Sequence, residues 1–229
     1  MEPGLHAVVL AGGKSSRFHL DKRFAILNGL PLFVYPLALC ASLTDKAILL
    51  VSSGERKRFR SALKAYPELS RRTVVRCDRK RWQGPLLALS SFARSAKLPP
   101  DALLLVLAAD MPGVEARALR ALIAAARAHP QAGVCLFRHL RRPQLFPSVW
   151  RKSALLSLPV SGRGKEASFE CWASDHAGWL HFLPFQSSRW KLSRQRFFAN
   201  INTPEDLLGF APSIAGGQDD AAGDPTASR

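Results

Sequence analysis

The stretch Leu10-Ala11-Gly12-Gly13-Lys14-Ser15-Ser16-Arg17-Phe18-His19-Leu20-Asp21-Lys22 decides the fold of this chain. It follows the apolar run His6-Ala7-Val8-Val9-Leu10, which predicts a buried strand. Its two adjacent glycines allow backbone conformations that other residues avoid. It also carries three spaced cations, Lys14, Arg17 and Lys22. A strand, a glycine turn with exposed N–H groups and nearby cations are together typical of a polyphosphate-binding loop.

Two common phosphate-binding loops are excluded. A Walker A loop needs a glycine five residues before Gly13, where Val8 stands. The dinucleotide fingerprint needs glycine spacings that this loop lacks. The structural alternative is a strand-to-helix turn with solvated charges. The three cations, together with Asp21, favour phosphate binding over that alternative.

Length and composition narrow the class of protein. The 229 residues are enough for one large domain or two small ones. The four cysteines and six histidines lack the spacing of a zinc or redox motif, which predicts reduced thiols and a cytoplasmic protein. No apolar run is long enough to cross a bilayer, so no membrane association is expected.

The formal net charge of +16 predicts an anionic partner, either nucleic acid, a membrane surface or a phosphorylated small molecule. The alternative is an arginine-rich overall composition without a dedicated partner. The basic clusters are dispersed over many predicted elements, and no aromatic residues are interleaved with them in a stacking pattern. Nucleic acid is therefore not the expected partner.

Predicted strands and helices alternate as far as Phe137. Strands are expected at His6–Leu10, Lys46–Val51, Thr73–Arg76, Ala102–Leu107 and Ala132–Phe137. Helices are expected at Pro31–Ser42, Glu55–Tyr66, Leu86–Ala96 and Glu115–Ala128, and a tight hairpin at Asn28-Gly29. The fourth of these strands is apolar throughout, which is typical of a central strand covered on both faces. Alternation with short connections predicts a parallel α/β sheet covered by helices on both sides.

Beyond Arg138 the alternation is less regular. The sequence predicts a short strand at Gln144–Pro147 that leads into a helix at Ser148–Leu158. Further on it predicts a helix at Lys165–Ala173, a strand at Gly178–Pro184 and a helix from Pro204 to about Phe210 with Thr203 as N-cap. Residues 212–229 have almost nothing apolar to bury and predict a disordered tail. We expect one domain over residues 1–211, with a nucleotide-binding part at about 1–130 and an acceptor-binding part at about 131–211.

Three features follow predicted strands and should meet at the carboxyl edge of the sheet, where open α/β sheets bind ligands. They are the Gly12-Gly13 loop, Cys77-Asp78 with Gly84-Pro85, and Asp110. Mg²⁺ prefers one or two carboxylates together with substrate phosphates and water. Asp110 is therefore the candidate metal ligand, and a turn or helix N-cap is its structural alternative.

The motifs in order resemble the molybdenum cofactor guanylyltransferase family. They are Leu10-Ala11-Gly12-Gly13 with Ser15, Arg17, Asp21 and Lys22, then Gly84-Pro85-Leu86, then Asp110-Met111-Pro112, then Asn200-Ile201-Asn202-Thr203-Pro204-Glu205-Asp206. The likeness runs from about Leu5 to Phe210. It implies a three-layer α/β/α sandwich with a mostly parallel, Rossmann-like nucleotidyltransferase sheet. It also implies transfer of GMP from GTP to molybdopterin carrying molybdenum, with Mg²⁺ as cofactor and release of pyrophosphate.

The resemblance also implies roles for individual residues. Leu10 to Gly13 would hold guanine and ribose, with Ser53 and Asp78 as further nucleotide contacts. Arg17 and Lys22 would bind the phosphates, and Asp110 would bind Mg²⁺. Gln144, Phe146, Asn200 and Asn202 would lie on the molybdopterin side. Molybdoenzyme maturation proteins are candidate partners, and a monomer or weak oligomer is expected.

Four positions depart from the family pattern. His19 stands where the family usually has glycine, and Ser53 where asparagine is frequent. Leu87-Ala88 replaces a common Ala-Gly. These departures leave open a related enzyme that uses CTP or another phosphorylated acceptor, and a non-catalytic accessory member of the family.

Overall fold

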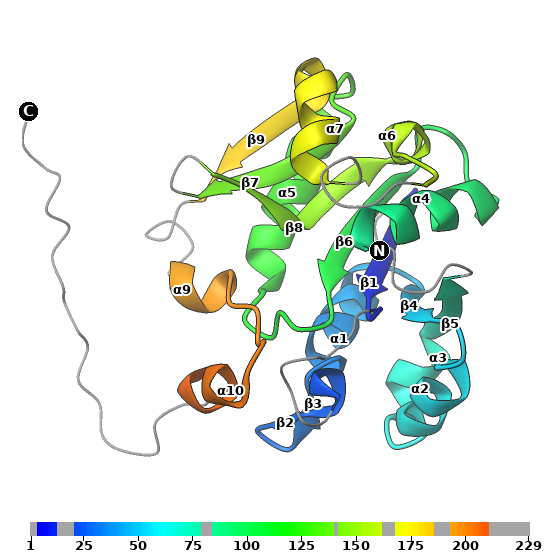
Figure 1. Cartoon of the computed structure of the whole chain (residues 1–229), viewed down its shortest axis with the longest axis vertical. Helices are drawn as coiled ribbons and strands as arrows, with labels where there is room; N and C mark the ends of the chain where they lie inside the picture. The colour runs from blue at the N-terminus through cyan, green and yellow to red at the C-terminus, as the bar shows by residue number, and fades with distance from the viewer. Residues whose placement is uncertain are drawn as a thin grey trace, which may run out of the picture.

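The computed structural model describes residues 4–12, 21–78, 84–139, 142–161, 168–185 and 193–210. Their centre is a seven-stranded sheet in the order β5-β4-β1-β6-β8-β7-β9 (Figure 1). In chain order the strands of this sheet are β1 (Leu5–Leu10), β4 (Ala47–Ser52), β5 (Thr73–Asp78), β6 (Leu103–Ala108), β7 (Val134–His139), β8 (Arg142–Arg151) and β9 (Leu180–Pro184). All neighbouring strands are parallel except for β8, which runs antiparallel to both β6 and β7. The predicted, mostly parallel α/β sheet is confirmed.

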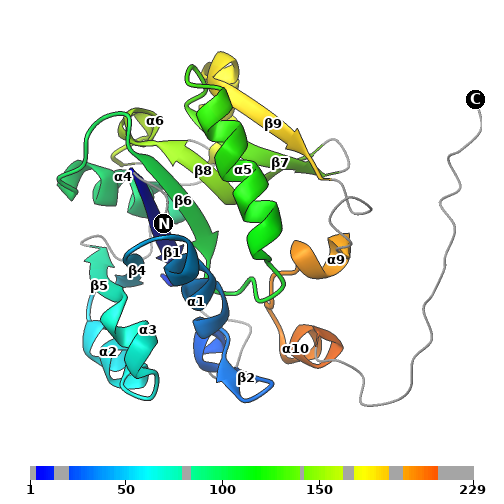
Figure 2. The ribbon, with the colours of Figure 1, turned by 180° about the vertical axis from the view of Figure 1, so that it is seen from behind.

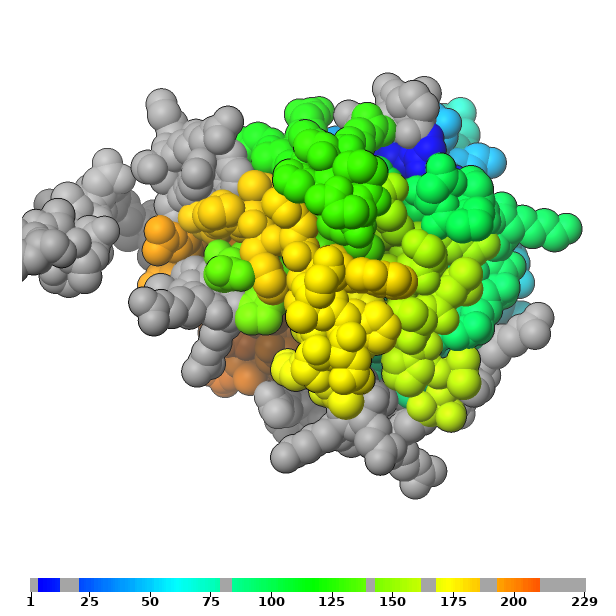
Figure 3. Space-filling view, turned by 90° about the horizontal axis from the view of Figure 1, so that it is seen from above, coloured from blue at the N-terminus to red at the C-terminus, as the bar shows by residue number. Residues whose placement is uncertain are grey.

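Helices cover both faces of the sheet, as predicted. One face of the sheet carries α1 (Val34–Leu43), α2 (Arg56–Leu63), α3 (Pro67–Arg71) and α5 (Ala116–Ala128). In Figure 2, α5 is seen in front of the sheet. The other face carries α4 (Pro85–Ser95), α6 (Lys152–Ser157) and α7 (Phe169–Asp175). Seen from above, α6, α7 and β9 (lime to yellow) lie side by side over one end of the molecule (Figure 3).

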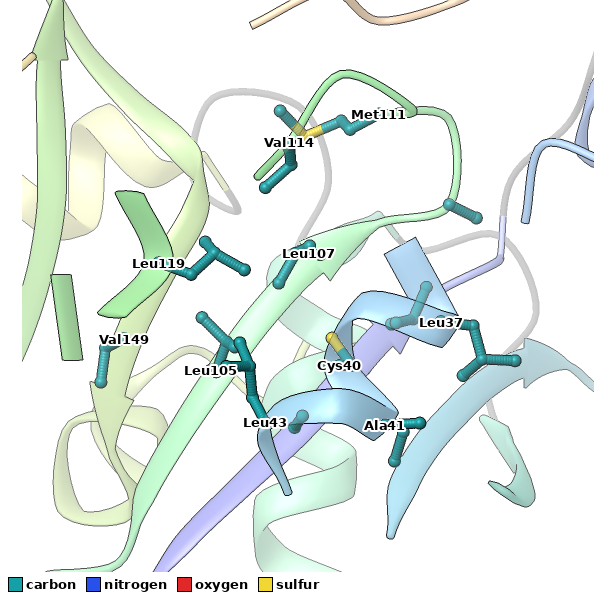
Figure 4. Packing of buried hydrophobic residues seen from close by; sticks show 14 of the residues in the cluster. Leu37, Cys40, Ala41, Leu43, Leu105, Leu107, Met111, Val114, Leu119 and Val149 are labelled. Carbon is teal, nitrogen blue, oxygen red and sulfur yellow. The ribbon is translucent and has the colours of Figure 1, made fainter. Parts of the chain in front are cut away.

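Each layer has its own apolar core, because successive side chains of a strand point to opposite faces. In the larger core, side chains of α1, β6 and α5 meet, among them Leu37, Leu105 and Leu119 (Figure 4). On the opposite face, Trp150 of β8 packs against Trp172 of α7 with ring centroids 5.1 Å apart. Strand β6 contributes to both cores, which confirms its predicted central position.

The small elements after β1 form the rim of the carboxyl edge. They are a 3-10 turn, η1 (Lys22–Phe24), and a hairpin of β2 (Ile26–Leu27) and β3 (Leu30–Pro31). The predicted turn of this hairpin is confirmed, since Asn28 and Gly29 have φ of 47° and 83°, as two-residue hairpin turns require. Two helices near the end of the described chain, α9 (Arg194–Phe197) and α10 (Pro204–Phe210), lie at the same edge (Figure 1).

The helix predicted at Ser148–Leu158 is wrong in its first half. Residues 148–151 belong to β8, which pairs with β6 and β7 at once, and the helix is limited to α6. The register of β8 jumps from Leu136 opposite Ser148 to Phe137 opposite Gln144, so residues 145–147 bulge out of the ladder. The strand predicted at Gln144–Pro147 is the bulged start of a strand of ten residues.

Other boundaries differ in smaller ways. The helix predicted at Glu55–Tyr66 is limited to α2, and the separate α3 follows it. In the described part of the helix predicted at Lys165–Ala173, Ser168 is the N-cap and residues 169–173 belong to α7, which continues to Asp175. A further short 3-10 turn, η3 (Ala177–Trp179), precedes β9. The predicted tail at 212–229 lies outside the described residues. Across the described ranges, no helix has the length and apolar character needed to cross a membrane.

Candidate active site

Three side chains from distant parts of the chain meet at the carboxyl edge of the sheet. Lys22 Nζ donates to Asp110 Oδ2 at 2.6 Å and to Asn202 Oδ1 at 2.7 Å. Lys22 opens η1, Asp110 follows β6, and Asn202 precedes α10. The Lys22 and Asp110 side chains are 20% and 17% exposed, so this ion pair is partly shielded from solvent.

A cavity of about 220 Å³ opens beside this ion pair. Its lining comes from the end of β1, η1, the first residue of α4, the end of β6 and the bulge of β8: Leu10, Ala11, Gly12, Lys22, Arg23, Pro85, Ala108, Ala109, Asp110 and Phe146. Strands β1 and β6 are neighbours, and Ala109 N donates to Leu10 O at 3.0 Å. The start of the glycine loop and Asp110 therefore lie together at the carboxyl edge of the sheet, as predicted.

The described part of the glycine loop approaches its neighbours closely at Gly12. A Cβ atom there would lie 3.3 Å from Ser52 Oγ, so a larger residue would push against the end of β4. Ala11 N donates to Leu50 O at 2.8 Å, which continues the ladder of β1 one residue into the loop. Gly13, Arg17 and His19 lie outside the described residues.

Arg23 is a buried cation in the wall of the cavity, which sequence reasoning missed. It is only 5% exposed. Its guanidinium donates to the carbonyl oxygen of Ala11, to both carboxylate oxygens of Asp21 (2.6 and 2.7 Å) and to the carboxylate of Glu55 (2.8 Å for Nη1–Oε2). The signal available in the sequence was a lone carboxylate, Glu55, directly before the basic run Arg56-Lys57-Arg58.

The charges around Asp21 keep it ionised. Burial alone would raise the pKa of Asp21, but hydrogen bonds from Arg23 and the positive charges of Arg23 and Arg58 outweigh burial and hold the pKa below its usual range. Burial opposes the charge of Arg23 in the same way, and its two carboxylate partners raise its pKa overall. The Arg23 guanidinium therefore stays protonated and donates to the Ala11 carbonyl oxygen of the glycine loop.

Asn202 is held in place by the residues around it. The N–H of Ile201 donates to the backbone carbonyl of Asp110 at 3.0 Å. Asp206 Oδ2 accepts from the N–H groups of Asn202 and Thr203, and these bonds lower the pKa of Asp206. Thr203 Oγ1 accepts from Asp206 N at 3.2 Å, which confirms the predicted N-cap.

The remaining predicted site residues are spread along the same edge. Phe146 lines the cavity because the bulge of β8 carries it there. Asn200 accepts a hydrogen bond from Asn202 Nδ2 through its backbone oxygen at 3.2 Å. Gln144 is half-buried on the β8 ladder opposite Phe137, and it does not line the cavity.

Two predicted nucleotide contacts lie farther from the Lys22–Asp110 pair. Ser53 follows β4, and Asp78 ends β5, three strands away from β6. Asp78 lines a separate groove beside α4 and not this cavity. Leu87 faces that groove too, whereas Ala88 is partly buried and packs on the smaller core. The two enlarged positions on α4 therefore do not narrow the cavity beside Asp110.

The chemistry of the cavity fits a divalent cation held together with a substrate. Asp110 is the carboxylate among its lining residues, and the amide oxygen of Asn202 lies within reach of the same lysine. One carboxylate completed by phosphate oxygens and water is a common Mg²⁺ arrangement. No cluster of three or more His, Cys, Asp or Glu side chains suited to a metal occurs in the described ranges, which argues against an all-protein metal cage there.

Comparison with known proteins finds relatives over nearly the whole chain. The molybdenum cofactor guanylyltransferase of Syntrophotalea carbinolica is 28% identical over 222 residues, which cover 91% of this chain and 96% of that protein. A "Probable molybdenum cofactor guanylyltransferase" of Nostoc sp. (strain PCC 7120) is 27% identical over 228 residues, 98% of this chain and 97% of that protein.

A solved structure shows the same fold. The molybdopterin-guanine dinucleotide biosynthesis protein A of Archaeoglobus fulgidus superposes with a TM-score of 0.64 at 20% identity, covering 90% of this chain and 96% of that one. The sequence profile of the MobA-like NTP transferase domain matches residues 7–170, which include the glycine loop, Lys22 and Asp110. The chain therefore belongs to the family of MobA-like NTP transferase domains.

Proposed function

We propose that this protein transfers GMP from GTP to the phosphate of molybdopterin carrying molybdenum and releases pyrophosphate. The observation that carries the proposal is the contact of Lys22 with both Asp110 and Asn202. A nucleotidyl transfer needs charge neutralisation and in-line positioning of two anionic substrates, and these three side chains supply a cation, a metal ligand and an amide at one point. Family membership and the names of the relatives support the same reaction.

Lys22 has two roles in the proposed reaction. Before substrate binds, its ammonium group neutralises Asp110 at 2.6 Å. When GTP binds, the ammonium group turns from the carboxylate to the phosphate oxygens, because the triphosphate brings more negative charge than Asp110 alone. Asp110 is then the residue that would hold Mg²⁺, which supplies further neutralisation of the phosphates when bound.

The attacking group needs little activation. A phosphate monoester has a second pKa of about 6, so the molybdopterin phosphate is largely ionised at neutral pH. No general base is required, and the protein contributes orientation and electrostatic stabilisation. Arg17 is the second proposed phosphate ligand.

In this proposal, each of the two parts of the chain binds one of the two substrates. Leu10 to Gly13, Ser53 and Asp78 bind the nucleotide within residues 1–130. Gln144, Phe146, Asn200 and Asn202 bind the acceptor within residues 131–211. Lys22 belongs to the first part and contacts Asn202 of the second, which supports the proposal that the reacting phosphates of both substrates meet beside it.

Two substitutions test the proposed site against matched controls. Lys22→Ala and Asp110→Ala should each lower the rate of GMP transfer by about a hundredfold or more. Lys46→Ala and Asp45→Ala make the same chemical changes at exposed positions just before β4, on the opposite edge of the sheet, and should leave the rate unchanged. The assay is release of pyrophosphate from GTP with Mg²⁺ and molybdopterin, with circular dichroism of each variant as a check on folding. Full activity in both site variants would exclude this site.

The same assay decides the substrate. GTP and CTP are compared with molybdopterin as acceptor, and other phosphorylated acceptors follow. Turnover with CTP alone would identify a related cytidylyltransferase, and binding of GTP without any turnover would identify an accessory protein. The cytoplasm as location, molybdoenzyme maturation proteins as partners and a monomer or weak oligomer stay predictions, to be tested by cell fractionation, co-purification and light scattering.

A further inference from the structure

A second cavity opens where the loop between β6 and α5 meets the helices α9 and α10. It measures about 230 Å³ and shares no lining residue with the cavity at Asp110. We call it the α9 pocket. Figures 1 and 2 both show the loop after β6 passing beside the two helices. The residues that give the pocket its chemistry are Pro112, Gly113, Glu115, Ser193, Arg196 and Phe210.

Two segments of the chain join the α9 pocket to the candidate active site. They are residues 110–115 and residues 196–202, and each has one end at the pocket. The N–H of Ile201 donates to the carbonyl oxygen of Asp110 at 3.0 Å. Nearer the pocket, a Cβ atom on Gly113 would overlap a backbone carbonyl group of α9. The two segments therefore run together from the candidate active site to the wall of the pocket.

The polar groups of the α9 pocket are a carboxylate, a guanidinium and a hydroxyl group. Both hydrogen bonds from Arg117 to Glu115 end on Oε2, at 3.1 and 3.2 Å, so Oε1 has no donor among the described residues. Arg196 Nη2 donates to the backbone oxygen of Phe210 at 2.7 Å, whereas Arg196 Nε and Nη1 have no acceptor in the same ranges. Ser193 Oγ accepts from Arg196 N at 3.4 Å, and its O–H is left to donate.

These groups match one kind of heterocyclic edge. The free carboxylate oxygen accepts an N–H group, while the guanidinium and the hydroxyl group donate to a carbonyl oxygen. A 2-amino-4-oxopyrimidine ring carries these partners side by side, with amino and ring N–H groups next to a carbonyl oxygen. Pro112 and the Phe210 ring supply apolar surface on which such a flat ring can pack. Pterin and guanine both contain this ring.

We propose that the α9 pocket binds the pterin ring of the acceptor and that Glu115 selects it by its 2-amino group. Glu115 Oε1 accepts from the amino N–H, and Oε2 keeps its bonds from Arg117. Arg196 donates to the ring carbonyl oxygen through the atoms that have no acceptor in the described chain. The inference rests on the proposed function, because it assigns the ring end of the acceptor whose phosphate would bind beside Lys22.

The spacing suits the shape of molybdopterin. Gly113 is three residues from Asp110, and successive Cα atoms are about 3.8 Å apart, so these two Cα atoms are at most about 11 Å apart. Molybdopterin is a fused tricyclic molecule with its pterin ring at one end and its phosphate at the other. One molecule can therefore place its phosphate beside Asp110 and its ring in the α9 pocket.

Guanine is the other source of the same ring chemistry. The position of the pocket favours pterin, because the described start of the glycine loop, which is proposed to hold guanine, lines the other cavity. A guanine base in the α9 pocket would have to belong to a second nucleotide. The test therefore includes a guanine compound as a separate probe.

The test measures binding of 6-hydroxymethylpterin to the whole protein without GTP or turnover. Two comparison probes are 6-hydroxymethyllumazine, which has a carbonyl group in place of the 2-amino group, and guanosine. Affinities come from titrations followed by ligand-observed NMR, which detects weak binding. The pterin should bind about tenfold more tightly than the lumazine, because the lumazine cannot donate to Glu115 and leaves a charged acceptor unpaired.

A variant with a matched control tests the assigned residue. Glu115→Gln should weaken pterin binding about tenfold and reduce the preference for pterin over lumazine, because the new amide group can donate to the lumazine carbonyl. A role of Glu115 in folding alone would not change that preference. Glu68→Gln makes the same change at an exposed glutamate that also pairs with an arginine of its own helix, and it should have no effect.

The same variant gives a kinetic readout. In the transfer of GMP, Glu115→Gln should raise the KM for molybdopterin about tenfold and leave kcat and the KM for GTP unchanged. This pattern is expected of a contact that is made equally in the ground state and in the transition state, since the ring lies away from the reacting phosphates.

The outcomes separate this inference from the proposed function. Equal affinity for pterin and lumazine, or an unchanged preference in Glu115→Gln, would overturn the inference even where GMP transfer takes place. A preference for pterin that Glu115→Gln removes would support the inference even without GMP transfer, and only the proposed function would then fail. Tighter binding of guanosine than of the pterin, lost in Glu115→Gln, would overturn the inference and assign the pocket to a second nucleotide.

Discussion

Replacing Arg23 by methionine should destabilise the protein by about 3 kcal/mol at neutral pH. Arg23 bridges Asp21, Glu55 and the Ala11 carbonyl with a side chain that is only 7% exposed. Methionine keeps the length and apolar volume of the stem but leaves two carboxylates without this partner. Removal of one member of a buried ion pair costs about 3 to 5 kcal/mol, because the other charge stays desolvated.

The lower end of that range applies here. Asp21 keeps Arg58 at 2.8 Å, and the side chain of Glu55 is 20% exposed, so neither carboxylate is stranded completely. In a chain of this size, 1 kcal/mol shifts the melting temperature by about 2–4 °C, so a loss of about 6–12 °C is expected. Arg117→Met is the control, because its ion pair with Glu115 is about half exposed and should contribute less than about 1 kcal/mol.

The effect of Arg23→Met should depend on pH. The pKa of Asp21 is lowered in the folded protein, so Asp21 contributes stability above its unfolded pKa of about 4 and loses it as pH falls through the folded value. In the variant, burial acts on Asp21 without Arg23, its pKa rises, and protonation relieves the buried charge. The difference in stability between the two proteins should therefore shrink below about pH 4. Urea unfolding at several pH values measures it, and a difference under about 1 kcal/mol that is constant with pH would refute the reasoning.

Three further outcomes are expected. Gly113→Ala should cost about 2 kcal/mol in urea unfolding, because its Cβ would overlap the carbonyl group of Arg196; a variant as stable as the parent would contradict that packing. Thr203→Ala should cost about 1 kcal/mol through loss of the N-cap of α10, and thermal melts measure it. Thiol titration of the native protein should modify the two exposed cysteines only, because burial raises the pKa of the other two thiols, in Cys135 to about 11; rapid reaction of all four would contradict their burial.

The sequence was sufficient for the part of the fold that follows from local patterns. Buried parallel strands read as continuous apolar runs, so β1, β4 and β6 were predictable, and the rule that ligands bind at carboxyl edges brought Gly12 and Asp110 together. The turn at Asn28-Gly29 was predictable because both residues tolerate positive φ. Pro67 was also a usable signal for the start of α3, since proline suits the first turn of a helix.

The other parts of the fold and of the candidate site depend on contacts between residues that are distant in the sequence. Strand β8 contains Pro143 and Pro147, which argue against a strand, and it forms because β6 and β7 pair with it from both sides. Phe146 reaches the cavity through a shift in register, which no pattern of residues specifies. Arg23 resembles any surface cation in sequence, and only the folded chain brings Glu55 to it.

The side of the candidate site that is proposed to bind the acceptor depends on one close approach. Helix α9 can approach the loop after Asp110 because Gly113 has no side chain, and the N–H of Ile201, a few residues after α9, donates to the Asp110 carbonyl. Asn202 follows directly, and its amide oxygen shares Lys22 with Asp110. A ligand that moves Asn202 therefore removes one hydrogen-bond acceptor of Lys22, and a ligand that binds Lys22 takes this donor from both Asp110 and Asn202. If Lys22 binds as proposed, both substrates use this one ammonium group, so the proposed function predicts that the nucleotide and the acceptor influence each other's binding at this residue.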